Sequence, residues 1–179
     1  MSEGNGKEEV VARVVGHVRS GYAEPEDVHH VRRGWTEDMS RIMLTPGRGT
    51  KLAGLTGYSH IIVVFWIHRV KEWRMPSYGH KPPEVKVYAT RMPARPNPIG
   101  LSVVELVDFS TETGEILVRG LDAVDGTPVL DIKPYIPDFD SYPEATVPHW
   151  VDEHIERYHH GPGGHAHGHV HAHAEGKEH

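Results

Sequence analysis

The stretch Arg91–Ser102 combines anion-binding and amide side chains with a stiff backbone. It reads Arg-Met-Pro-Ala-Arg-Pro-Asn-Pro-Ile-Gly-Leu-Ser, in which each of the three prolines fixes φ and keeps the residue before it extended. A segment this stiff loses little conformational entropy when it presents Arg95 and Asn97 to a ligand. The competing interpretation is a rigid connection between strands, with both side chains in water. A plain connection has little need of two arginines and an asparagine, so we favour a binding function.

A second polar group follows in Leu121–Pro128 and the segment after it. Asp125 and the following glycine are typical of a tight hairpin turn, which by itself accounts for this aspartate. Asp131 and Lys133 are two residues apart on a predicted strand, so their side chains point to the same face. They form either part of a polar site or a plain surface ion pair.

A third candidate is His68-Arg69, at the end of an apolar run. A neutral imidazole titrates near working pH and suits a general base, although a histidine at a strand end is more often structural. The chain lacks the Gly-x-Gly-x-x-Gly, His-Glu-x-x-His and Gly-x-Ser-x-Gly motifs. Gly47–Lys51 fails the spacing of a phosphate loop and is better interpreted as a turn.

Composition excludes several classes of protein. The 179 residues contain no cysteine, so disulfide scaffolds, thiolate nucleophiles and cysteine-ligated zinc sites are excluded. The longest apolar run, Ile61–Ile67, is far shorter than the ~20 residues of a membrane helix. Residues 1–9 are polar and lack the apolar core of a signal peptide. We therefore expect a soluble, cytoplasmic protein that does not contact a membrane.

The net charge of −6 hides an uneven distribution along the chain. Residues 32–95 carry 12 basic and 4 acidic side chains, whereas residues 96–156 carry 2 basic and 13 acidic ones. The basic span either presents a local face to phosphates or pairs with the acidic later strands.

Residues 159–179 contain eight histidines among Gly and Ala, with nothing apolar enough to pack. We expect a disordered, low-complexity tail. Its imidazoles are able to bind a divalent metal such as Ni²⁺, Zn²⁺ or Cu²⁺, but a flexible tract fixes no geometry and selects poorly among them. The alternative is a passive tail.

Gly and Pro divide the rest of the chain into short, mostly strand-like segments. The only predicted helix runs from Pro148 to about Tyr158, and the run from His60 to Val70 is expected to be covered on both faces. This pattern predicts a mainly β, barrel-like or sandwich-like core. The expected organisation is a flexible N-terminus (1–9), one domain (10–158) and the tail (159–179). The predicted strands are Val10–Arg19, Arg41–Leu44, His60–Val70, Val85–Arg91, Ile99–Val107, Ile116–Leu121 and Val129–Lys133.

Several of these motifs, in this order, resemble the TsaA-like (TrmO) family. The resemblance covers residue 10 to about residue 150, and its most specific part is Arg95-Pro-Asn-Pro-Ile-Gly-Leu-Ser102. The other matching stretches are Val15–Ser20, Gly54–His60, Tyr88–Arg91, Asp122–Pro128 and Asp131–Pro137. The resemblance implies an antiparallel β-barrel that binds S-adenosylmethionine, as a homodimer. The implied activity is methylation of N6 of N6-threonylcarbamoyladenosine beside the anticodon of tRNA.

The resemblance also assigns residues. The cofactor contacts that it implies fall on His68, Arg69, Arg91, Leu101, Asp122, Ala123, Val124 and Asp125. A Pro-Arg-Gln cofactor contact that family members often carry near the N-terminus is replaced here by Glu24–Arg33, and the chain lacks the extra C-terminal domain of many bacterial members.

The reaction mainly needs donor and acceptor aligned, and no metal. Arg91 suits the methionine carboxylate, and Asp122 or Asp125 suits the ribose hydroxyls or the cationic donor. His68 is the hypothetical base. We expect Arg95, Asn97 and Lys133 to bind the acceptor. The expected catalytic residues are His68 and Asn97. Two alternatives stay open, namely another acceptor (a small molecule or a different RNA) and a metal-responsive protein acting through its tail.

Overall fold

The computed structural model describes residues 8–30, 38–69 and 84–160. The chain divides into two compact units. The first comprises Met1–Arg74 and Arg91–Ser141, and the second Met75–Thr90 and Tyr142–His179. Within the described residues, no helix is long and apolar enough to cross a membrane.

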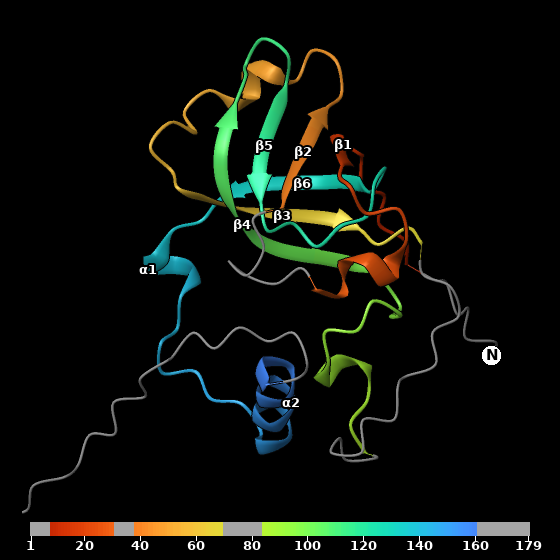
Figure 1. Ribbon diagram of the computed structural model, residues 1–179. Helices are drawn as coiled ribbons and strands as arrows, with labels where there is room; N and C mark the ends of the chain where they lie inside the picture. Colours follow the sequence, from red (N-terminus) through yellow and green to blue (C-terminus); the bar gives the residue numbers. More distant parts are fainter. Residues whose placement is uncertain (1–7, 31–37, 70–83, 161–179) are drawn as a thin grey trace, which may run out of the picture. The chain divides into compact units, whose positions relative to one another are not determined.

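The first unit is a closed barrel of six antiparallel strands, as Figure 1 shows. Around the barrel the strands follow the order β1-β2-β5-β4-β3-β6, so sequence neighbours are often not spatial neighbours. The predicted antiparallel β-barrel is therefore confirmed. The strands are β1 (Gly16–Arg19), β2 (Met39–Leu44), β3 (His60–Trp66), β4 (Ile99–Phe109), β5 (Glu115–Arg119) and β6 (Pro128–Pro134).

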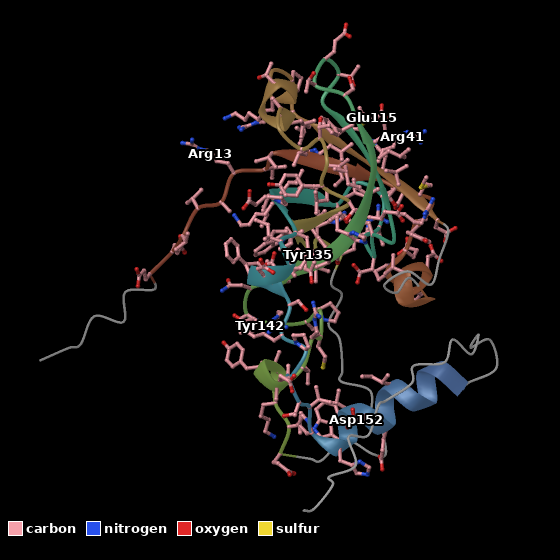
Figure 2. The ribbon with its side chains drawn as sticks, turned by 90° about the vertical axis from the view of Figure 1, so that its left-hand side faces the viewer. Arg13, Arg41, Glu115, Tyr135, Tyr142 and Asp152 are labelled. Carbon is pink, nitrogen blue, oxygen red and sulfur yellow. The ribbon has the colours of Figure 1, made fainter. Side chains whose placement is uncertain are left out.

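The apolar core fills the inside of the barrel. Along β3, Ile61, Val63 and Phe65 are buried, while the residues between them are more exposed. This alternation is the period of a strand with one face inside, so the prediction that β3 is covered on both faces was wrong. Elsewhere on the barrel the outer face carries polar pairs, such as Arg41 with Glu115 across β2 and β5 (Figure 2). The buried apolar side chains come from all six strands, from the short 3-10 helix η2 (Gly49–Leu52) and from the segment after β5. They include Val18, Ile42, Leu52, Val104, Ile116, Val118, Leu121 and Val129.

Two predicted strands differ from the structure. The first begins only at Gly16, and Val10 and Val11 are almost fully exposed, because pairing with the neighbouring segments starts at Val15. The segment Val85–Arg91 contains a short 3-10 helix, η3 (Val87–Ala89), in place of a strand. There the amides of residues 89 and 90 bond to carbonyls three residues back, and such local bonds replace a ladder.

Among the residues that the structure describes, the helices are few and short, as predicted. The one predicted after Pro148 is α2 (His149–His160), in the second unit, which also contains η3. On its first turns the side chains of His149 and Glu153 lie 3.2 Å apart. The remaining helices belong to the first unit and are η1 (Pro25–His30), η2 (Gly49–Leu52) and α1 (Pro137–Asp140). The histidine-rich tail beyond residue 160 lies outside the described residues, and the predicted domain limits 10–158 stay a prediction.

Candidate functional site

Within the described residues, one half of β4 pairs with a strand along only one of its edges, and the other edge is open. β4 pairs with β3 along Ile99–Glu105, but its pairing with β5 begins only at Glu105. Ile67 donates its N–H to the carbonyl of Pro98, and Leu106 to that of Ser59, so even-numbered residues of β4 turn their backbone groups toward β3. The N–H and C=O of Leu101 therefore face the open edge. A guanidinium nitrogen of Arg91, Nη2, donates to this carbonyl at 3.1 Å.

The segment 121–127 runs past this edge as a buried loop. Leu121, Ala123 and Val124 are buried, whereas Asp122 is exposed and Asp125 half-buried. The loop therefore anchors itself through its apolar side chains and offers two carboxylates. Asp122 accepts a hydrogen bond from Ser102 of β4, which ties the loop to the open edge.

Asp125 belongs to a tight turn that is not a hairpin. The amide of Thr127 bonds to the carbonyl of Val124, and Gly126 takes the positive φ of 77° that such a turn requires. The turn leads from β5 to β6, which are not neighbours in the barrel, so the hairpin prediction was wrong. The turn bonds instead to the end of β1, because the amide of Gly126 donates to the carbonyl of Val18.

Residues 20–24, which we term the strap, lie against this turn. The hydroxyl of Ser20 donates to the carbonyl of Ala123 at 2.9 Å, and the amide of Asp125 donates to the carbonyl of Tyr22 at 2.8 Å. The Asp125 carboxylate accepts from the amide of Ser20 at 3.2 Å and from Arg19 at 3.4 Å. This carboxylate therefore helps to hold the strap in place.

His68 lies beside the same loop. Its Nδ1 is 3.4 Å from the hydroxyl of the buried Thr127. Partial burial lowers the pKa of His68, and the charge of Arg69 and the neighbouring His17 lower it further. The imidazole is thus held neutral to lower pH than usual, as a base requires. Arg69 donates from Nη1 to the carbonyl of Ala23 at 2.5 Å, which joins the end of β3 to the strap.

The residues expected to bind the acceptor each contact a different partner. Arg95 is half-buried and donates to the backbone carbonyl of Met92. Asn97 is exposed, and its backbone carbonyl accepts a hydrogen bond from the amide of Ile99. Lys133 faces outward on β6 and lies 2.5 Å from Asp131, whose carboxylate raises its pKa. The plain ion pair left open by the sequence is therefore present.

The sequence model of one family, described as the tRNA-methyltransferase O N-terminal domain (TrmO_N), matches residues 17–141. The chain belongs to the TrmO_N family. A relative from Methanothermobacter thermautotrophicus, named a probable S-adenosyl-L-methionine-binding protein, is 45% identical over 136 residues, covering 74% of this chain and 95% of the relative. The tRNA (adenine(37)-N6)-methyltransferase of Escherichia coli is 41% identical over 104 residues, covering 52% and 43%.

A solved structure agrees with this assignment. The crystal structure of TrmO superposes with a TM-score of 0.67 at 32% identity. The match covers 78% of this chain and 64% of that chain, so the present sequence spans less than two thirds of that neighbour.

The TrmO_N match contains every residue assigned to the site, and it ends where the barrel unit ends, at residue 141. Helix α2 and the tail lie outside it. Direct hydrogen bonds join all eight positions expected to contact the cofactor to one another or to the strap, β4 and the 121–127 loop. They are His68, Arg69, Arg91, Leu101, Asp122, Ala123, Val124 and Asp125.

Sequence reasoning missed four residues that hold the candidate site together, namely Ser20, Tyr22, Ser102 and Thr127. Ser20, Ser102 and Thr127 lie inside the motifs described above. Their position as small hydroxyl residues within these motifs is the sequence signal that could have identified them. The basic span, residues 32–95, was expected either to face phosphates or to pair with the acidic later strands. In its described part, Arg41 does pair with Glu115 of a later strand, whereas Arg69 pairs with Glu24, which precedes the span.

Proposed function

We propose that this chain transfers the methyl group of S-adenosylmethionine to N6 of N6-threonylcarbamoyladenosine beside the anticodon of tRNA. The observation that carries the proposal is the meeting of an open strand edge, an arginine and two carboxylates at one end of a TrmO_N barrel. The name of the Escherichia coli relative supplies adenine 37 and its N6 as the methylated position. The threonylcarbamoyl group is what the family resemblance implies.

The residues at the open edge suit S-adenosylmethionine, a nucleoside that carries a sulfonium cation and a zwitterionic amino-acid group. The N–H of Leu101 faces the open edge, where a backbone donor can read a nucleobase. Asp122 is exposed, and carboxylates accept hydrogen bonds from ribose hydroxyls. Arg91 uses one of its five donors on Leu101 and keeps others for the methionine carboxylate. S-adenosylmethionine, when bound, supplies an electrophilic methyl group on a sulfonium.

His68 acts as the base in this proposal. The acceptor N6 lies between an adenine ring and a carbonyl, so it is a poor nucleophile until it loses its proton. A neutral imidazole accepts that proton, and the lowered pKa of His68 keeps it neutral at working pH. The contact with Thr127 orients the ring.

Arg95, Asn97 and Lys133 bind the acceptor RNA in this proposal, Asn97 acting close to the reacting group. The stiff backbone between the prolines supports Arg95 and Asn97, and the cationic Lys133 suits a phosphate. We also propose a cytoplasmic location, where a tRNA substrate would be met. A homodimer is supported by the outer face of the β3–β4 pair, where Trp66, Ile99 and Leu101 are 38%, 46% and 49% exposed.

The test is nucleoside mass spectrometry after incubation with S-adenosylmethionine and tRNA that carries the threonylcarbamoyl group without the methyl. We expect the methylated nucleoside with the wild-type chain and its loss in Arg91→Ala. The matched control is Arg48→Gln, because Arg48 bonds Thr45 at the opposite end of the barrel. Cofactor binding without methylation of tRNA would contradict the acceptor and favour a small molecule or another RNA.

A further inference from the structure

Arg69 is placed to connect two parts of the site that are far apart in the sequence. It follows His68 at the end of β3, and its guanidinium reaches the backbone of the strap. The bond to the carbonyl of Ala23 measures 2.5 Å, and the carboxylate of Glu24 lies 3.6 Å from the same nitrogen. The main partner is thus a backbone carbonyl, and the ion pair is secondary.

The strap is held on its other side by the loop of Asp122 and Asp125. Ser20 bonds the carbonyl of Ala123, and Tyr22 receives the amide of Asp125. The far end of the strap is fixed as well, since the amides of Ala23 and Glu24 bond the carboxylate of Asp27 at 3.0 and 2.9 Å. Hydrogen bonds at both ends of the strap therefore connect Arg69 to Asp125 through the backbone of the strap.

We infer that Arg69 is a positioning residue, which holds the strap and thereby the Asp122–Asp125 loop in register with the end of β3. This inference rests on the proposed function and concerns the guanidinium of Arg69, whose bonds go to the strap. Its physical basis is that a charged donor on a backbone carbonyl is stronger than a neutral one. A Lys in its place would supply one point donor without the planar fork.

The first measurement is amide hydrogen exchange of the cofactor-free protein. We expect faster exchange across residues 20–27 in Arg69→Gln than in the wild type, with no change in the Arg48→Gln control. Unchanged exchange in Arg69→Gln, together with weakened cofactor binding, would assign Arg69 to direct contact and overturn the inference. Because this measurement needs neither cofactor nor tRNA, it stands even if the proposed function fails.

The second measurement separates binding from chemistry. In Arg69→Gln we expect the KM for S-adenosylmethionine to rise about tenfold with kcat nearly unchanged, because only the preformed site is lost. Arg69→Lys should recover part of this loss, and Glu24→Gln should change KM less than about twofold, since the exposed ion pair is weak. A fall in kcat at saturating cofactor in Arg69→Gln would contradict a positioning role. A wild-type chain that binds no S-adenosylmethionine would refute the proposed function and leave the exchange result as the test of the strap.

Discussion

At the scale of single residues, the environment of His68 determines how the site responds to pH. The imidazole is partly buried, and Arg69 and His17 lie near enough to disfavour a second positive charge. The Nδ1 atom of the ring lies 3.4 Å from the hydroxyl of Thr127, which carries no charge. All three causes of the shift therefore act in one direction, toward the neutral ring.

The proposed base predicts an acid limb in the pH dependence of kcat/KM. The rate should fall only when pH drops through the pKa of His68, which lies below the ordinary histidine value. His17→Gln removes one neighbour that lowers this pKa, so the limb should move to higher pH. The measurement is methyl transfer against pH for the wild type and this variant.

His68→Gln tests the role of the base directly. It should abolish most of the turnover while leaving the affinity for S-adenosylmethionine within a few-fold of the wild type. Retention of full turnover in His68→Gln would remove His68 from the role of base.

At the scale of elements, β4 couples the site to the barrel core. Gly100 faces the inside of the barrel, opposite Phe65 of β3. A Cβ at this glycine would lie 2.3 Å from the ring of Phe65, a buried side chain that would have to shift to make room. The glycine in the Pro-Ile-Gly-Leu motif therefore allows the open-edge half of β4 to approach its neighbour.

Gly100→Ala should accordingly lower the free energy of unfolding by about 1–3 kcal/mol. Urea denaturation measures this, with Gly21→Ala as the control, since no atom lies within 4 Å of a Cβ there. We expect the control to stay within about 0.5 kcal/mol of the wild type. Equal stability of the two variants would contradict tight packing at Gly100.

Much of the element pattern was predictable because alternation and turn residues are local signals. The cores of β2, β3, β4, β5 and β6 follow from their apolar, β-branched runs. The failures arose where local signals are ambiguous. Val10–Val15 is as apolar as a strand, but pairing partners decide whether it becomes one, and Val85–Arg91 satisfies its backbone bonds by turns.

The candidate site shows the same division. The motifs marked His68, Arg91, Leu101 and Asp122, and these do lie along one end of the barrel. The hydroxyls of Ser20 and Ser102 escaped notice because their value depends on contacts between segments distant in sequence. Strand order is likewise a long-range property, so the separation of β5 from β6 was not predictable from the turn between them.

At the scale of the whole molecule, the barrel carries the proposed chemistry and the histidine-rich tail lies outside the matched family region. Removal of residues 161–179 should therefore leave affinity for S-adenosylmethionine and methyl transfer unchanged. Both forms should sediment with the mass of a dimer, because the exposed apolar side chains of β3 and β4 remain. Only the full chain should bind Zn²⁺ with more than one equivalent, which isothermal titration measures.

Loss of methyl transfer on this truncation would contradict a passive tail and favour the metal-responsive alternative. A monomeric mass for both forms would contradict the dimer. A truncated chain that still binds Zn²⁺ as the full chain does would place the metal on the barrel or on α2.

The strand order also has a consequence for synthesis. β1, β2, β5, β4 and β3 form a continuous sheet whose two edges are β1 and β3, and β6 alone joins these edges. Because β6 is the last of the six strands in the sequence, the barrel cannot close until β6 has been synthesised. Before that, β1 and β3 each lack one neighbouring strand, and unpaired strand edges are templates for wrong pairing with other chains. The strand that closes the barrel also carries Lys133 to its outer face.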